Sequence, residues 1–345
     1  MFKQRARSQM KKTELMESWM SSNSTFSPKE KILNTSFSIE TTIAQQLKQR
    51  WDKAVNVLFF QFKNSSSSSP SSPSKSKSLF CSDSWYQQIK SFYSNESERK
   101  YHTIWHLVEM FGYLDILFPI KTIGSYHKKD HEVSVAILTM SIFFHDAIYN
   151  PKSSTNEEDS AILYTQFRKE MEESYLESSE SSTPITMEQS CSSLNFSSNS
   201  ISPHDIISNF IIETKSHSIP SKPNKIYDEE TLTLLQIFMD MDLSVLAKTP
   251  KAYDNYAYLI RQEYRFVERS IYCSKRVEIL QDFLTHPSIF HSNAMTTIQC
   301  SSQDDDATNF CSLEERSRMN LKREIECLQN GIIPGENDVV DKSKK

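Results

Sequence analysis

Histidine and aspartate side chains occur in two places at a spacing that suits a metal site. His102 and His106 lie four residues apart, so on a helix they share one face. His145 and Asp146 are neighbours at the end of an apolar run. Imidazole suits transition metals and carboxylate suits most hard or borderline cations. The two clusters together therefore indicate a site for a metal or for proton transfer.

Two acids further along the chain are candidates to complete this site. Asp240 and Asp242 stand in the mostly apolar segment Phe-Met-Asp-Met-Asp-Leu. An unpaired carboxylate is costly to bury, so such an acid needs a cation or a hydrogen-bonding partner. Residues two apart on a helix diverge by about 200°, so only one of the two can share the apolar face. The residues alone leave open which one it is.

The elements that must position these groups are predicted to be helices. Apolar residues recur at three- and four-residue spacing, no stretch alternates convincingly as a strand does, and the chain has only 4 glycines. In an all-α protein, metal ligands must come from several helices that point into a bundle. The predicted helices cover residues 39–62, 84–93, 102–118, 132–149, 155–175, 203–214, 228–247, 252–284 and 313–328.

Polar, serine-rich stretches interrupt the helical pattern. Their composition buries too little apolar surface to offset the entropy lost on ordering. We therefore predict one all-α domain over residues 37–330. Disordered inserts are expected at about 64–82, 177–201 and 287–312, and disordered tails at 1–36 and 331–345.

Composition excludes several classes of protein. A formal net charge of −5 argues against a nucleic-acid-binding surface. The longest apolar run, of about 12 residues, is too short for a membrane span. The 6 cysteines show no CxxC spacing, which favours free thiols in the cytoplasm. A basic N-terminus without an apolar core leaves a mitochondrial transit peptide as the alternative. The oligomeric state stays open.

Taken in chain order, these motifs resemble the HD superfamily of metal-dependent phosphohydrolases, in particular its predicted members of uncharacterised substrate. The resemblance covers about 40–62 and 83–330, apart from the inserts. A lone His-Asp pair is weak evidence, whereas the ordered set is specific. The matching segments are 99–106, 145–151, 156–158, 160–161, 214–217, 240–243, 256–264 and 318–321.

The resemblance implies a divalent cation held by His106, His145, Asp146 and one late aspartate. Asp242 is favoured over Asp240 because the family's aspartate usually precedes a hydrophobic helical continuation. The ligand set does not distinguish Mn, Mg, Co, Ni, Fe and Zn. Asp146 is expected to act also as a general base, and His102 as a general acid. Further contacts to metal or substrate are assigned to His217, Asp240 and Arg261.

The implied function is hydrolysis of a phosphate ester or anhydride of a small molecule, such as a nucleotide, by metal-activated water. The alternatives are a non-catalytic regulator that binds a metal or a nucleotide, and a di-iron oxygenase with His217 at a second metal. The segment around His102 also resembles cyclic-nucleotide phosphodiesterases, in which the equivalent histidine donates a proton. Those enzymes carry Asn where Thr103 stands here, and their nucleotide-selecting glutamine has no counterpart, so cyclic nucleotides are not expected.

Each of these residues also has a purely structural interpretation. The pair His145-Asp146 can be a satisfied core pair, and His102 a histidine at a helix N-terminus without chemistry. His217 can serve as a structural hydrogen-bonding group. Arg261 can pair with an acid on its own helix.

Overall fold

The computed structural model describes residues 31–60, 74–94, 99–118, 128–176, 201–217, 219–220, 222–296, 298 and 312–336. The chain divides into two compact units, residues 1–47 and 48–345. In the first unit the described part is the N-terminal portion of helix α2 (Lys31–Val55). The greater part of the predicted inserts and tails falls on residues outside the described ranges.

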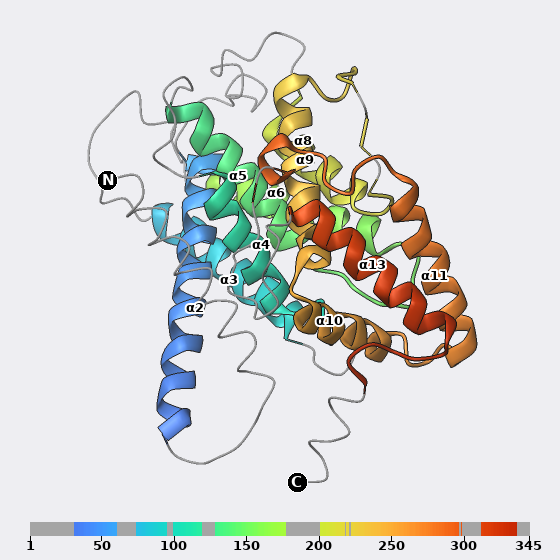
Figure 1. Ribbon diagram of the computed structural model, residues 1–345. Coiled ribbons are helices and arrows are strands. Elements are labelled where there is room, and N and C mark those ends of the chain that lie inside the picture. The colour runs from blue at the N-terminus through green and yellow to red at the C-terminus, as the bar shows by residue number, and fades with distance from the viewer. Residues whose placement is uncertain are drawn as a thin grey trace, which may run out of the picture. The chain divides into compact units, whose positions relative to one another are not determined.

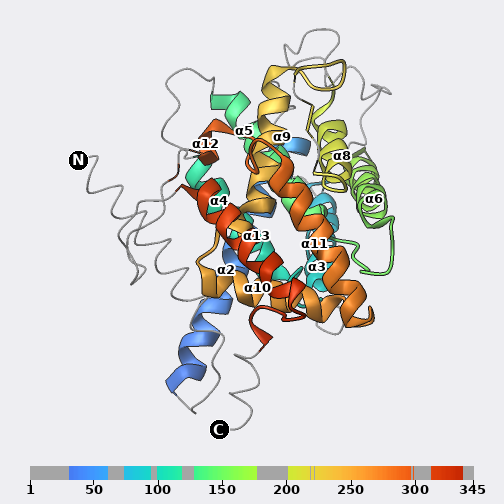
Figure 2. The same cartoon turned by 45° about the vertical axis from the view of Figure 1, so that its right-hand side comes forward.

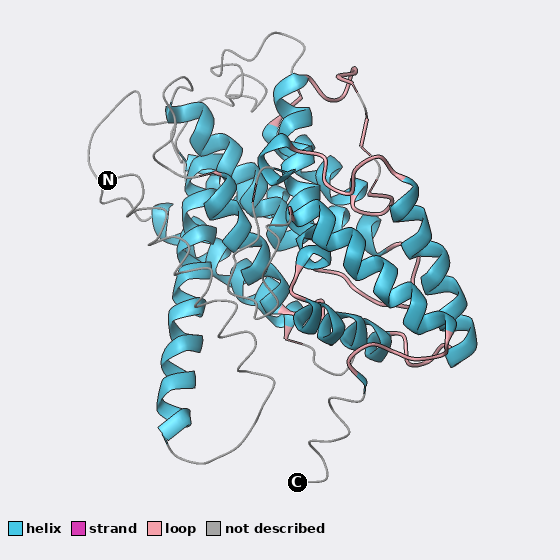
Figure 3. Cartoon of the chain, viewed as in Figure 1, coloured by secondary structure: helices cyan, strands magenta, loops and turns pink. Residues whose placement is uncertain are grey.

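In the second unit the regular elements of the described residues are all helices, joined by turns and loops, and no strand occurs in those residues (Figure 3). The all-α fold class predicted from the sequence is thereby confirmed. No helix in this part of the chain combines the length and the apolarity that a membrane crossing requires. After α2 the elements are η1 (Asn56–Phe60), α3 (Ser74–Tyr93), α4 (Ile104–Leu117), α5 (Lys128–Phe144), α6 (Asn156–Leu176), α8 (Pro203–Glu213), α9 (Glu229–Leu243), η3 (Ser244–Ala247), α10 (Pro250–Glu263), α11 (Arg269–Thr285), α12 (Asn293–Thr296) and α13 (Leu313–Gln329).

Helix α5 is the central element because apolar residues surround almost its whole circumference. It contacts α4, α6, α8 and α9, and Leu138, Met140 and Ile142 on it are fully buried. A helix that is apolar all round has to be covered on every side. Its last residue, Phe144, is also buried, which fixes the direction in which the next residues, His145 and Asp146, leave the helix.

Two apolar clusters pack the second unit. Trp51 is the centre of the first: its ring centroid lies 5.4 Å from that of Phe143 and 5.2 Å from that of Phe167. The second joins η3, α10, α11 and α13, with Tyr253, Leu280 and Leu321 at its centre. Helices α11 and α13 lie side by side in both ribbon views (Figures 1 and 2).

The single helix predicted over 252–284 is wrong. Helix α10 ends at Glu263 and α11 begins at Arg269. The turn needs neither glycine nor proline because side chains satisfy the backbone groups at both helix ends. Arg261 donates through Nη1 to the carbonyls of Tyr264 and Val267, and the Glu268 carboxylate accepts from the first N–H groups of α11.

The predicted inserts and tails are too wide. Helix α2 begins at Lys31, inside the predicted N-terminal tail, and α3 begins at Ser74, inside the first insert. The third insert starts too early, since residues 287–296 include Ile289, Phe290 and Met295, all buried in the second cluster. The C-terminal tail also starts too early, since Ile333 is buried there. In the third insert and the C-terminal tail, a few buried apolar side chains are enough to hold the segment, and composition averaged over the segment hides them.

His204 on α8 should make stability depend on pH. Its ring is buried and bonded to the Tyr164 hydroxyl at 2.7 Å, and burial lowers its pKa to about 3. Between about pH 6.5 and pH 3 the unfolded chain binds this proton and the folded chain does not. Stability contributed by the neutral ring is therefore complete above pH 6.5 and falls at about 1.4 kcal/mol per pH unit below it.

We expect the variant His204→Gln, which keeps an acceptor for Tyr164, to show a shallower loss of stability in urea unfolding between pH 7 and pH 5. Carboxylates elsewhere contribute equally to both proteins, so the difference between the two slopes isolates His204. Equal slopes would show that His204 titrates normally in the folded protein.

Candidate metal centre

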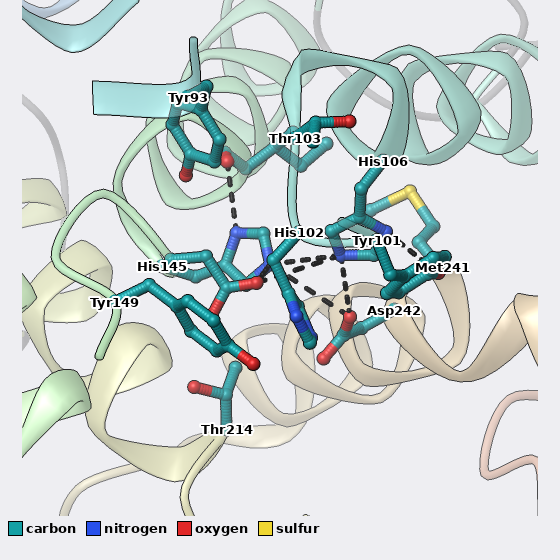
Figure 4. A network of polar contacts seen from close by, with 12 residues as sticks. Tyr93, Tyr101, His102, Thr103, His106, His145, Tyr149, Thr214, Met241 and Asp242 are labelled. Carbon is teal, nitrogen blue, oxygen red and sulfur yellow. Dashed lines mark hydrogen bonds and ion pairs between the residues drawn. The ribbon is translucent and has the colours of Figure 1, made fainter. Parts of the chain in front are cut away.

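Three helices bring the predicted ligands together (Figure 4). His106 lies in the first turn of α4, His145 and Asp146 follow the end of α5, and Asp242 lies near the end of α9. The two imidazoles are almost completely buried, whereas the side chains of Asp146 and Asp242 are 20% and 15% exposed. Solvent therefore reaches the cluster from the carboxylate side.

Each imidazole of this cluster lies 3.0–3.9 Å from the two carboxylates, a spacing close to that of ligands of one cation. His106 Nε2 lies 3.2 Å from His145 Nε2 and 3.0 Å from Asp242 Oδ1. Asp146 Oδ2 lies 3.2 Å from His145 Nε2 and 3.9 Å from His106 Nε2. Atoms about 2.1 Å from a shared metal stand roughly 3.0–3.5 Å apart in tetrahedral or octahedral sites. The ligand atoms of His106, His145 and Asp146 lie close enough together to hold a metal ion. Asp242 Oδ1, which lies 3.9 Å from His145 Nε2, is placed beside these three as a further candidate ligand.

Hydrogen bonds at the far side of each ring determine which nitrogen faces the cluster. His145 Nδ1 donates to the carbonyl of Ile142 at 3.0 Å, so the neutral ring presents a lone pair at Nε2. The hydroxyl of Tyr101 occupies His106 Nδ1 at 3.0 Å, which again turns Nε2 inward. Two imidazole lone pairs and two carboxylate oxygens at this spacing repel each other unless they share protons or a cation. The donor set thus fits a divalent cation.

The pKa values of His145, Asp146 and Asp242 also favour a cation at this site. Burial lowers the pKa of His145, but the carboxylates of Asp146 and Asp242 outweigh it and raise that pKa to about 9. Burial raises the pKa of Asp146, whereas His145 and His102 bring it below its usual value. Asp242 likewise has a pKa well below the usual one, despite burial, because His106 and His217 bond to it. Without a cation, both carboxylates are therefore ionised at neutral pH and His145 holds a proton. A bound cation would take the place of that proton at Nε2 and be balanced by the two negative charges.

His102 lies close to the cluster but not on the predicted helix. Helix α4 begins at Ile104, and Thr103 is its N-cap residue, with a side chain that accepts from the N–H of Trp105. His102 therefore precedes the helix, and its predicted position in the first turn is wrong. The ring centroids of His102 and His106 are nevertheless 6.0 Å apart. Thr103 thus serves as an N-cap, and Asn is equally suited to that position. A Thr in place of Asn therefore keeps the helix capped.

The two acids of α9 have separate roles. Asp242 points into the cluster, as described above. Asp240 is fully buried and accepts the backbone N–H groups of His291 and Ser292, each at 2.7 Å. Burial raises its pKa to about 6, against the lowering effect of these hydrogen bonds. The structure thus places Asp242, and not Asp240, beside His106 and His145, and Asp240 has backbone N–H groups as its partners.

The remaining two predicted contacts also separate. His217 follows α8 in a left-handed backbone conformation, with φ of 49°, and its Nε2 lies 3.1 Å from Asp242 Oδ2. It therefore belongs to the edge of the site. Arg261 instead bonds the turn between α10 and α11, and its guanidinium lies 4.7 Å from the ring centre of Tyr272. In the structure Arg261 therefore stabilises this turn, which is the structural role considered for it from the sequence.

Two residues of the matching segments received no role from the sequence. The buried Arg99 donates through Nη1 to the carbonyls of His102 and Asp146, and through Nη2 to that of Ala147. It thereby joins the loop before α4 to the turn after α5. The buried Glu263 binds the loop of His102 from the other side. The only signal for either residue is its place in a matching segment, since the partners are backbone groups distant in sequence.

Comparison of the chain with protein-family models, with curated proteins and with solved structures finds no match. The likeness to the HD superfamily therefore rests on the order of the motifs and stays a prediction.

The two acids of α9 can be told apart by substitution. Asp242→Asn should reduce the bound metal of the purified protein while the protein still folds, because the amide keeps the shape of a partly exposed side chain, although its ion pairs with His106 and His217 are lost. Asp240→Ala should cost about 2–5 kcal/mol, because two buried N–H groups lose their acceptor. Metal analysis and urea unfolding measure the two effects. Loss of metal from a folded Asp240→Ala protein, with Asp242→Asn unaffected, would reverse the assignment.

Proposed function

We propose that the protein is a metal-dependent phosphohydrolase that cleaves a phosphate ester or anhydride of a small molecule. The observation that carries this proposal is the convergence of two imidazole nitrogens and two ionised carboxylates in a half-open site, with a further imidazole, His102, beside it. Hydrolysis of a phosphate ester needs charge stabilisation, a proton acceptor and a proton donor, and this arrangement offers all three. The ordered resemblance to the HD superfamily supports the same class.

His106, His145, Asp146 and Asp242 would hold the cation. When bound, a divalent cation lowers the pKa of a water molecule and offsets charge on a phosphoryl oxygen. Asp146 is suited to take the water's proton, because its carboxylate is ionised and reaches solvent. His102 is suited to give a proton to the leaving oxygen.

The donor atoms of the site are compatible with several divalent cations. Mixed nitrogen and oxygen ligands without thiolate suit Mn, Fe, Co, Ni, Zn or Mg. Among the described residues the cysteines Cys81, Cys273 and Cys327 are free thiols. Free thiols are typical of a reducing compartment, which supports the cytoplasm as the place of action.

One contact favours a second candidate function, di-iron oxygenase chemistry. Asp242 turns Oδ1 toward His106 and Oδ2 toward His217, so its carboxylate can bridge two cations. A second cation would need ligands beyond His217. Metal content separates the candidates: one ion for each chain supports the hydrolase, and two irons support the oxygenase.

The purified protein, loaded in turn with each of these divalent metals, should hydrolyse at least one member of a panel of phosphate esters and anhydrides. Activity should disappear with a chelator and return with metal. His145→Ala should lose both metal and activity, since it removes a buried ligand. Turnover that survives removal of all metal would contradict the proposal, and bound metal without any turnover would support a regulatory protein instead.

His102→Ala should retain metal yet hydrolyse esters with a poor leaving group roughly 10²–10⁴-fold more slowly, the usual contribution of a positioned acid. An ester with a very acidic leaving group needs no proton and should lose little rate. Metal analysis of the variant is the control. A variant that has lost its metal would show that His102 is a ligand.

A further inference from the structure

Glu263, the last residue of α10, accepts hydrogen bonds from the backbone of residues 100–102 and from two side chains of the site. Its side chain is completely shielded from solvent. Oε1 accepts the backbone N–H groups of Lys100, Tyr101 and His102 at 2.6, 2.8 and 3.1 Å. Oε2 accepts from His102 Nδ1 and from the Tyr149 hydroxyl, both at 2.7 Å. One carboxylate thus holds the backbone and the ring of His102 together.

A carboxylate surrounded only by donors stays ionised even when it is buried. Burial raises the pKa of Glu263, but His102 and the hydrogen bonds outweigh it and lower that pKa to about 2. An ionised carboxylate only accepts, so His102 Nδ1 must carry the hydrogen of their shared bond. Nε2, on the opposite side of the ring, is then the nitrogen that can meet a substrate.

The ring of His102 is held on its other faces as well. It lies against the ring of Tyr149, with centroids 4.4 Å apart, and edge-on to His106. Arg99 donates to its backbone carbonyl and, through the same Nη1, to that of Asp146. The ring that we assign as proton donor is therefore fixed relative to the residue that we assign as proton acceptor.

We propose that Glu263 is the positioning residue of the reaction: it orients His102, keeps a hydrogen on Nδ1 and stabilises the ring in its protonated form, so that Nε2 can protonate the leaving oxygen. This inference rests on the proposed hydrolase function. As water adds to phosphorus, one of its protons passes to Asp146. As the bond to the leaving oxygen breaks, the Nε2 proton of His102 passes to that oxygen. The proton on Asp146 then returns to His102 through solvent.

The test compares Glu263→Gln with a matched control, Glu324→Gln. Glu324 is equally buried but bonds to Tyr253 and Arg276 instead of His102. The amide introduced by Glu263→Gln can still accept backbone N–H groups but carries no charge for the imidazolium. We expect Glu263→Gln to keep its metal and to lose about 10²-fold in kcat on esters with a poor leaving group, and little on an ester with a very acidic one. Glu324→Gln should treat both esters alike.

Combining Glu263→Gln with His102→Ala separates positioning from general damage to the site. If Glu263 acts through His102, the double variant should be no slower than His102→Ala alone. Independent, multiplying losses would overturn the proposal. So would an equal loss on all leaving groups in Glu263→Gln.

A spectroscopic readout does not depend on turnover. A histidine Nδ1–H bonded to a carboxylate gives a downfield proton resonance in NMR spectra. We expect such a resonance in the wild-type protein and in Glu324→Gln, and its loss in both His102→Ala and Glu263→Gln. Its absence from the wild type, or its persistence in Glu263→Gln, would overturn the proposal. A wild-type protein that shows the resonance but hydrolyses no phosphate would overturn the hydrolase function while retaining the Glu263–His102 pair.

Discussion

Buried carboxylates must be matched by donors or cations, because an isolated charge is strongly disfavoured inside a packed core. Two buried carboxylates, Asp240 and Glu263, and the partly exposed Asp242 organise the centre of this protein, each in a different way. Asp240 is matched by two backbone N–H groups of the segment before α12. Glu263 is matched by the backbone and ring of His102 and by Tyr149. Asp242 is matched by imidazoles alone, and these are themselves potential metal ligands.

This difference separates structural from chemical acids within one fold. Backbone N–H groups cannot move away or exchange protons readily, so an acid bound by them acts as a fixed anchor. Imidazoles can release a proton and bind a cation in its place, so an acid bound by them remains open to chemistry. Asp240 and Asp242 show this contrast two residues apart on α9, because side chains two residues apart on a helix point in directions that differ by about 200° and so meet different neighbours.

The loop before α4 and the turn after α5 are held by two opposite charges. Arg99 donates to the carbonyls of both segments, and Glu263 accepts from the N–H groups of the first and the tyrosine of the second. Neither segment is helical, so its backbone groups need partners from elsewhere. Arg99 and Glu263 supply these partners and at the same time fix the distance between His102 and the His145-Asp146 pair. The same contacts thus position the site and satisfy the backbone groups of its loops.

Much of the fold could be predicted from the sequence, because local signals determine helices. The capping side chains Ser202 and Ser312 act over one or two turns, and the helices predicted over 203–214 and 313–328 agree with the structure. The apolar periodicity of α5 indicated a helix correctly, but the predicted helix 132–149 runs past the observed end at Phe144, so His145 and Asp146 lie outside it. The break between α10 and α11 was missed because its capping groups are charged side chains instead of glycine or proline. The ordered residues in the supposed inserts were missed because the burial of an apolar side chain such as Phe290 depends on the residues that pack against it, which are distant in sequence.

For the site, the sequence by itself determined which residue types are present and which of them fall in a specific order. Only the tertiary structure decided which acid of α9 joins the histidines, that His102 precedes its helix, and that Arg261 bonds a turn. It alone assigned partners to Arg99 and Glu263. The physical reason is that the partners of a buried charge are chosen by three-dimensional proximity. Glu263 meets residues more than 110 positions away, and no local pattern in the chain encodes that meeting.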